Sequence, residues 1–267
     1  MKLDLEDVLR TIRPLVEEQG KLAVRRGSSA VPRVHKDRRD FATAVDLEIE
    51  RNLKAELHTR YPDHGLSGEE TGDEHRDADY QWLIDPIDGT KYYAGHSSLY
   101  TVSVGLLYRG DPVLGIVYAA ASGQCFYAWQ GGGAFVNGQA LQVNPVSDLS
   151  QVVLNVDTPK THLLLADERA WFEAKLVELS REVYRVRALG IGSLAACWLA
   201  SGALDAYVDL TGYVKPQDVA AGRVILSEAG ARVDYVDPGV GPRRLLASSP
   251  RLWEELRERL TAKASPC

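Results

Sequence analysis

The chain has 267 residues, of which 45% are hydrophobic and 25% charged, a composition typical of a soluble globular protein and not of a disordered chain. The formal net charge of -6 disfavours a nucleic-acid partner, and no apolar run approaches the length of a membrane span, so we expect no membrane contact either. The three cysteines, Cys125, Cys197 and Cys267, form no CxxC pair, which favours a reducing, cytoplasmic location over a disulfide framework or a zinc–thiolate site.

The start of the chain predicts two helices joined by a loop. Residues 3–26 carry apolar side chains at helical spacing, and Pro14 is expected to kink this helix or to mark its true start. Residues 27–40 combine Gly, Ser and Pro with a strongly charged run, which indicates a solvated loop. Residues 40–46 then lead into a second helix, which is expected to end at Pro62.

The next region predicts an antiparallel sheet. Residues 65–70 are expected to form a short strand or loop, and residues 71–80 a polar, exposed segment. Asn137-Gly138 is a hairpin signature. Apolar runs between turn signals predict strands at 99–108, 113–119 and 125–129.

Residues 145–150 are polar and lie between two strand-like segments, so we place a domain boundary there. The boundary would separate an N-terminal α+β domain, residues 1–146, from a C-terminal α/β domain, residues 147–267. The second part alternates between short strands and helices, which predicts an α/β layer with short connections. The expected strands are 152–156, 183–186, 206–209, 231–235 and 245–247, and the expected helices are 167–179, 193–200, 218–229 and a last one after Ser249-Pro250.

The stretch Trp-Leu-Ile-Asp-Pro-Ile-Asp-Gly-Thr at residues 82–90 carries the strongest chemical signal. Its three apolar residues predict the end of a buried strand, which is expected to stop at Asp85-Pro86 because proline cannot donate to a strand ladder. Asp85 and Asp88 then fall in one tight turn, and Gly89 can adopt a backbone conformation closed to other residues. Crowded carboxylates repel one another unless cations lie between them, and their oxygens suit Mg²⁺ or Mn²⁺ better than zinc or copper. An ordinary turn is the alternative.

A related pattern, Asp-x-Asp-Gly-Thr after a hydrophobic strand, occurs in haloacid-dehalogenase-type phosphatases, where the first Asp is a nucleophile and the second an acid. Here the two carboxylates lie three residues apart, with Pro86 between them. The extra residue would break the nucleophile–acid geometry, so this mechanism is disfavoured.

Three separated motifs resemble those of one family. Gly68-Glu69-Glu70 is similar to a GEE motif, residues 82–90 to WxxDPxDGT, and residues 218–222 with 228–230 to WDxAAG…EAG. Weaker similarities lie at residues 40–46, 131–141, 192–193 and 202–205. On these motifs, which cover nearly the whole chain, it resembles the inositol monophosphatase superfamily of metal-dependent, lithium-inhibited phosphatases.

The resemblance implies a mixed α+β fold built as an α/β/α/β/α sandwich, like that of inositol monophosphatase and fructose-1,6-bisphosphatase, with the site between the two halves. It also implies two or three Mg²⁺ ions per site, with Mn²⁺ as an expected substitute. The first ion would be held by Glu69, Asp85 and the Ile87 carbonyl, the second by Asp85, Asp88 and Asp218, and a third by Glu69 and water.

For catalysis, the resemblance implies that Thr90, partnered by Asp46, orients and deprotonates the attacking water, with Glu69 and Glu70 beside it. Because Glu69 and Glu70 are adjacent, they point different ways in a regular backbone, and only one easily reaches a shared site. The resemblance also implies that the backbone amides at 89–90 bind phosphate oxygens and that residues 192–193 line the polyol. The full set of implied substrate contacts is Asp88, Gly89, Thr90, Gly192, Ser193 and Asp218.

The expected activity is a Mg²⁺-dependent phosphomonoesterase that hydrolyses inositol 1-phosphate or a related small phosphorylated polyol or sugar by attack of a metal-activated water. The alternatives within the family are a fructose-1,6-bisphosphatase, a 3′(2′),5′-bisphosphate nucleotidase and a histidinol-phosphatase. Outside the enzymes, the alternative is a regulatory or binding protein that keeps the fold, although the intact set of acids favours an enzyme. The resemblance further implies a homodimer.

Two departures from the family pattern leave the substrate open. The family's Trp before the C-terminal Asp is Gln217 here, and the preceding loop lacks a clear counterpart of the acid that binds inositol, Asp209 being the nearest but out of register. The loop offers Tyr213 and Lys215 instead. A solvated Lys215 is one interpretation. The other is that it pairs with a second anionic group, which predicts a broad phosphatase that also accepts a bisphosphorylated sugar or nucleotide.

Overall fold

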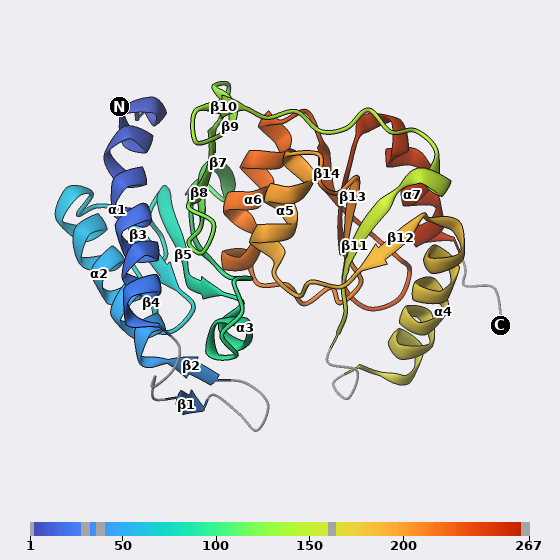
Figure 1. Ribbon diagram of the computed structural model, residues 1–267, viewed down its shortest axis with the longest axis horizontal. Helices are drawn as coiled ribbons and strands as arrows, with labels where there is room; N and C mark the ends of the chain where they lie inside the picture. The colour runs from blue at the N-terminus through green and yellow to red at the C-terminus, as the bar shows by residue number, and fades with distance from the viewer. Residues whose placement is uncertain (1–2, 28–32, 36–40, 160–163, 263–267) are drawn as a thin grey trace.

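The computed structural model describes residues 3–27, 33–35, 41–159 and 164–262, and its helices and sheets stack in five layers (Figure 1). The layered α/β/α/β/α arrangement expected from the sequence is therefore confirmed. In order across the molecule, the layers are α1 (Leu5–Arg26) with α2 (Ala44–Arg60), an eight-stranded sheet, α5 (Gly192–Ala200) with α6 (Pro216–Glu228), a five-stranded sheet, and α4 (Ala166–Glu182) with α7 (Pro250–Thr261).

The eight-stranded sheet has the order β10-β9-β8-β7-β6-β5-β3-β4, and its neighbours are antiparallel except for β3 and β5. The expected hairpin at Asn137-Gly138 is confirmed, since both residues have positive φ and join β9 to β10. The strands are β3 (Gly65–Gly68), β4 (Gly72–Glu74), β5 (Tyr80–Asp88), β6 (Thr101–Tyr108), β7 (Asp111–Ala119), β8 (Gln124–Trp129), β9 (Gly133–Val136) and β10 (Gln139–Ala140).

The five-stranded sheet has the order β12-β11-β13-β15-β14. Its parallel part brings the carboxyl ends of β11 and β13 together, so that Asp157 pairs with Asp209 across the two strands. The elements are β11 (Val153–Asp157), β12 (Arg185–Arg187), β13 (Ala206–Asp209), β14 (Arg232–Val236) and β15 (Arg244–Ser248), with the 3₁₀ helix η1 (Leu149–Gln151) before them. The domain division at residues 146 and 147 stays a prediction.

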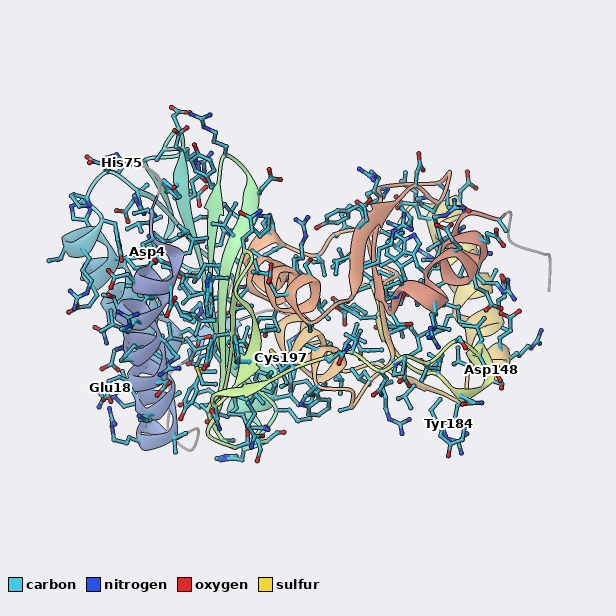
Figure 2. All side chains as sticks on the ribbon, turned by 90° about the horizontal axis from the view of Figure 1, so that it is seen from above. Asp4, Glu18, His75, Asp148, Tyr184 and Cys197 are labelled. Carbon is cyan, nitrogen blue, oxygen red and sulfur yellow. The ribbon has the colours of Figure 1, made fainter. Side chains whose placement is uncertain are left out.

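The middle layer packs very closely on the first sheet. A Cβ atom at Gly115 of β7 would lie 2.3 Å from the carbonyl oxygen of Ala221 in α6, and one at Gly222 would lie 2.6 Å from the Cβ of Ala196 in α5. The Ala-Ala-Gly segment of α6 therefore consists of residues with small side chains, which let the two helices and the sheet approach backbone to backbone. Figure 2 shows Cys197 in this layer, between the two sheets.

Cysteine pairing follows the expectation for the described part of the chain. Cys125 and Cys197 are both buried and both free. Cys267 lies outside the described residues. Within the described ranges, we also find no helix with the length and apolar character needed to cross a bilayer.

In the N-terminal region, one of the two roles expected for Pro14 and part of the expected loop were wrong. The first helix begins at Leu5, so Pro14 lies inside it and does not mark its start. Asp4 caps that start by accepting hydrogen bonds from two backbone amides of the first turn. The region expected as a loop contains β1 (Arg33–His35), which pairs antiparallel with β2 (Phe41–Thr43). The rest of the expected loop lies mostly outside the described residues.

The expected end of the central strand at Asp85-Pro86 was also wrong. Strand β5 continues to Asp88, and its register against β6 shifts between Asp85, which pairs with Ser103, and Asp88, which pairs with Thr101. Pro86 lies in this irregular step, where a missing backbone N–H is tolerated. The bulge re-aims the two carboxylates at the end of the strand.

Replacing Gly115 by Ala should destabilise the protein by about 1–3 kcal/mol, because the added methyl group overlaps the backbone of α6. Thermal unfolding followed by circular dichroism would measure this as a lower Tm. An unchanged Tm would show that α6 can move away from the sheet without cost.

Candidate functional site

Most of the residues singled out in the sequence line one cavity of about 380 Å³. The ends of β3 and β5, the short helix α3 (Thr90–Ala94), the start of α6 and the segment before α5 all contribute to its wall. The wall consists of Glu69, Asp85, Ile87, Asp88, Gly89, Thr90, Lys91, Tyr92, Thr158, Ala188, Leu189, Gly190 and Asp218. Asp46, Glu70, Gly192 and Ser193 are not part of it.

Three carboxylates converge in this cavity from both halves of the chain. Glu69, Asp85 and Asp218 each offer an oxygen within 4.8 Å of the others. Asp85 is 2% exposed, and its Oδ1 has no hydrogen-bond partner among the described residues. Burial, followed by the charge of Glu69, raises the pKa of Asp85 well above its usual value, and the same two causes raise the pKa of Asp218 to about 7.

This arrangement fits a divalent cation. A buried carboxylate oxygen without a partner is costly, and a second and third acid beside it add repulsion. An ion between the three oxygens would remove both penalties. Because all the donors are oxygens, the set suits Mg²⁺, Mn²⁺ or Ca²⁺ rather than zinc or copper.

Asp88 lies beside this group, and hydrogen bonds from Ser193 hold its carboxylate in place. Its Oδ2 accepts hydrogen bonds from the backbone N of Ser193 at 2.9 Å and from Ser193 Oγ at 2.5 Å. Ser193 Oγ lies 2.6 Å from Thr101 Oγ1 and is fully buried. Since the Ser193 proton goes to Asp88, Thr101 donates to Ser193. In this structure Ser193 holds Asp88 in place, and its role as a polyol contact stays a prediction, as does that of Gly192.

Thr90 and Asp46 form the pair that the resemblance implies. Thr90 Oγ1 lies 3.1 Å from Asp46 Oδ1 and 2.9 Å from the carbonyl oxygen of Ile87, and its single proton can serve only one of them at a time. Asp46 is fully buried, and its Oδ2 accepts from the N–H and hydroxyl of Thr43, which cap α2. Burial raises the pKa of Asp46.

Gly89 follows the bulge and begins α3 with a φ of 96°. A Cβ atom there would lie 2.8 Å from the carbonyl oxygen of Leu99, so both the conformation and the space require glycine. The turn can therefore present the backbone of Gly89 and Thr90 to the cavity.

The turn after β3 depends on Glu50, a residue that the sequence analysis missed. Glu50 is fully buried on α2 and accepts hydrogen bonds from Glu70 N at 2.8 Å and from Thr71 N at 2.7 Å. A Cβ atom at Gly68 would lie 2.0 Å from Glu50 Oε1, which explains the glycine before the two glutamates. The sequence signal that could have identified Glu50 is its spacing, because it lies one helical turn after Asp46 on the apolar face of the helix.

Asp157 is a second residue that the sequence analysis missed. It is 6% exposed and accepts a hydrogen bond through Oδ2 from the hydroxyl of Tyr207, while Oδ1 has no partner among the described residues. Burial raises the pKa of Asp157 to about 6. The next residue, Thr158, lines the cavity, so this buried acid lies directly behind the wall.

The loop before α6 joins the two halves of the molecule at the cavity. Lys215 Nζ donates to Glu69 Oε1 at 2.7 Å, and Gln217 Nε2 donates to Ser67 Oγ at 2.9 Å. Asp209 accepts from the backbone N–H groups of Thr211 and Gly212, and it shapes the loop. The hydroxyl of Tyr213, which is not part of the cavity wall, donates to Glu168 of α4 at 3.1 Å.

The chain is similar to known proteins over nearly its whole length. A model of the inositol monophosphatase family matches residues 4–266. The chain is 34% identical over 220 residues to Nus factor SuhB of Vibrio cholerae, covering 79% of each chain. It is 30% identical over 219 residues to the fructose-1,6-bisphosphatase/inositol-1-monophosphatase of Aquifex aeolicus, covering 82% of this chain and 81% of that one.

Solved structures show the same fold. The extragenic suppressor protein suhB of Bartonella henselae superimposes with a TM-score of 0.86, covering 96% of this chain and 99% of that one. Its sequence identity of 22% is low, so this similarity concerns the fold alone.

Replacing Glu50 by Ala should destabilise the protein by about 2–4 kcal/mol, because the fully buried Glu50 carboxylate is removed and two part-buried backbone N–H groups lose their acceptor. Urea unfolding would measure the change. Glu48→Ala on the same helix is the matched control, since Glu48 forms a surface ion pair with Arg26 at 2.6 Å that should contribute little to stability. Equal losses in both variants would contradict the role given to Glu50.

Replacing Asp157 by Asn should stabilise the protein relative to the wild type, and this difference in stability should grow as pH rises. The native pKa of about 6 lies above the unfolded value of 3.8, so the stability contributed by Asp157 is present below about pH 4 and is lost as pH rises through about 6. Asn does not ionise, so the variant should gain up to about 3 kcal/mol on the wild type by pH 7.5. Thermal melts in chelator at pH 4 and pH 7.5 test this, and a pH-independent difference would contradict it.

Proposed function

The chain belongs to the inositol monophosphatase family and is a phosphoric monoester hydrolase, and from that premise we propose that it is a Mg²⁺-dependent phosphatase of small phosphorylated polyols or sugars, with inositol 1-phosphate as the first candidate. The observation that carries the proposal is the group of three converging carboxylates around the buried Oδ1 of Asp85, which has no hydrogen-bond partner among the residues that the structure describes. A bound cation would offset the repulsion within such a group, and a cation next to a cavity of this size attracts a phosphate.

The proposed ligands of the ions are the acids of the cavity and one carbonyl group. When bound, Mg²⁺ would neutralise phosphate oxygens and lower the pKa of the attacking water. The residues that would hold it are Glu69, Asp85, Ile87 through its carbonyl group, Asp88 and Asp218.

We assign water activation to Thr90 and Asp46. When the Thr90 hydroxyl donates to Asp46, its oxygen is left to accept a hydrogen bond from a water in the cavity. The proton of that water can then pass through Thr90 to Asp46, whose pKa is raised by burial and which is therefore a better base than an exposed Asp. Because the 69–71 turn is held by Glu50, Glu69 is the glutamate that reaches the cavity, and the catalytic role of Glu70 stays a prediction.

Phosphate and alcohol would be recognised by different parts of the cavity. The backbone N–H groups of Gly89 and Thr90 would bind phosphate oxygens, while the segment 188–190 and Thr158, which line the same cavity, would contact the leaving alcohol. A volume of about 380 Å³ suits a single sugar or polyol ring. The expectation that Lys215 binds a second anionic group stays a prediction, as do a homodimer and the absence of a nucleic-acid partner.

The direct test is phosphate release from inositol 1-phosphate, fructose 1,6-bisphosphate, histidinol phosphate and 3′-phosphoadenosine 5′-phosphate, with Mg²⁺ or with excess chelator. We expect Mg²⁺-dependent turnover with the first substrate, inhibition by Li⁺ because a small hard cation competes for oxygen ligands, and partial activity with Mn²⁺. Full turnover in chelator would sink the proposal.

Replacing Asp88 by Asn should lower kcat by about 10²–10³-fold without unfolding the protein. The amide oxygen of Asn can still accept from Ser193, so the change removes a charge and leaves no cavity. Steady-state kinetics with a parallel thermal melt would measure both effects. A variant that keeps more than about half of the activity would show that Asp88 is not a ligand.

A further inference from the structure

Lys215 contacts two of the three converging acids. Its Nζ donates to Glu69 Oε1 at 2.7 Å, and its backbone N donates to Asp218 Oδ2 at 3.3 Å. The side chain of Glu69 is 15% exposed and that of Lys215 is 49% exposed, so the ion pair lies at the mouth of the cluster and not in its interior. A cation of the protein itself is thus bonded to an oxygen of the group that fits a metal ion.

The position of this ammonium group is set by the fold. Lys215 is the N-cap residue of α6, and Pro216 fixes the first helical turn after it. The helix cannot slide on the first sheet because Gly115 and Ala221 meet backbone to backbone. Gln217 adds a second bond from the same turn to Ser67, two residues before Glu69.

The electrostatic consequence has two parts. Without a bound cation, the ammonium group offsets part of the repulsion among the acids and ties the two halves together. A divalent ion at the same cluster must displace Lys215 from Glu69 or accept a like charge beside it, and either costs binding free energy. We propose that Lys215 is an internal competitor that weakens Mg²⁺ binding to this cluster while it stabilises the metal-free protein.

This inference rests on the proposed metal site, and it predicts two effects of opposite sign. Lys215→Gln should tighten Mg²⁺ binding by about threefold or more, since it removes a half-exposed ion pair and a neighbouring like charge. The same change should lower the Tm of the chelator-treated protein. A residue that only supports the structure would, on removal, weaken metal binding and stability together.

The experiment is calorimetric titration of Mg²⁺ into chelator-stripped protein at fixed ionic strength, without substrate, with a thermal melt of each stripped variant. Lys91→Gln is the matched control, because Lys91 lines the same cavity and pairs with no carboxylate in the described ranges. We expect Lys91→Gln to change Mg²⁺ affinity less than about twofold, because salt screens the interaction between the Lys91 charge and the bound ion. Lys215→Arg should stay close to the wild type because it keeps the charge.

Unchanged or weaker Mg²⁺ binding by Lys215→Gln, or an equal gain in Lys91→Gln, would overturn the inference while leaving the proposed function intact. An unchanged or higher Tm of the stripped Lys215→Gln protein would overturn the stabilising half. If the wild-type protein itself binds no Mg²⁺ in the titration, the proposed metal site fails and the inference fails with it.

Discussion

The repulsion among carboxylates at the end of β5 is the constraint on which the rest of the site depends. Asp85 is buried, has an oxygen with no hydrogen-bond partner in the described part of the chain, and faces acids that come from the turn after β3 and from a helix of the other half. Left alone, such a group would push its members apart or take up protons. The surrounding structure prevents the first, because each acid is held by elements that are themselves fixed by packing or by hydrogen bonds.

The supporting bonds share one design. Ser193 with Thr101 holds Asp88, Thr43 holds Asp46, and Glu50 holds the turn that carries Glu69. In each case the support comes from buried groups whose hydrogen bonds are satisfied, so the site gains rigid geometry without a second layer of uncompensated charge. Asp157 is the exception, since it adds a further buried acid just behind the cavity wall.

Much of this arrangement can be predicted from local sequence, and the remainder cannot for a physical reason. Short-range signals such as the Asn137-Gly138 pair and the glycine at position 89 predict the local backbone conformation, which has positive φ at all three residues. The five-layer fold follows from the resemblance carried by the family motifs. The continuation of β5 past Pro86 could not be predicted, because it depends on pairing with β6, a strand distant in the sequence. Residues on both sides of Pro86 pair with β6, and this outweighs the local tendency of proline to end a strand. A buried acid such as Glu50 cannot be told from an ordinary helical residue in the sequence, because its hydrogen-bond partners lie about twenty residues away and meet it only in the folded protein.

The shared middle layer has a consequence for synthesis of the chain. Helices α5 and α6 come late in the sequence, yet they cover an apolar face of the sheet that is built from the first half (Figure 1). While the chain emerges from the ribosome, that face stays uncovered until α6 has been made, and the unpaired surface is open to association with other chains. The last of the converging acids, Asp218, lies on the same helix, so the helix that covers the sheet also completes the acidic cluster.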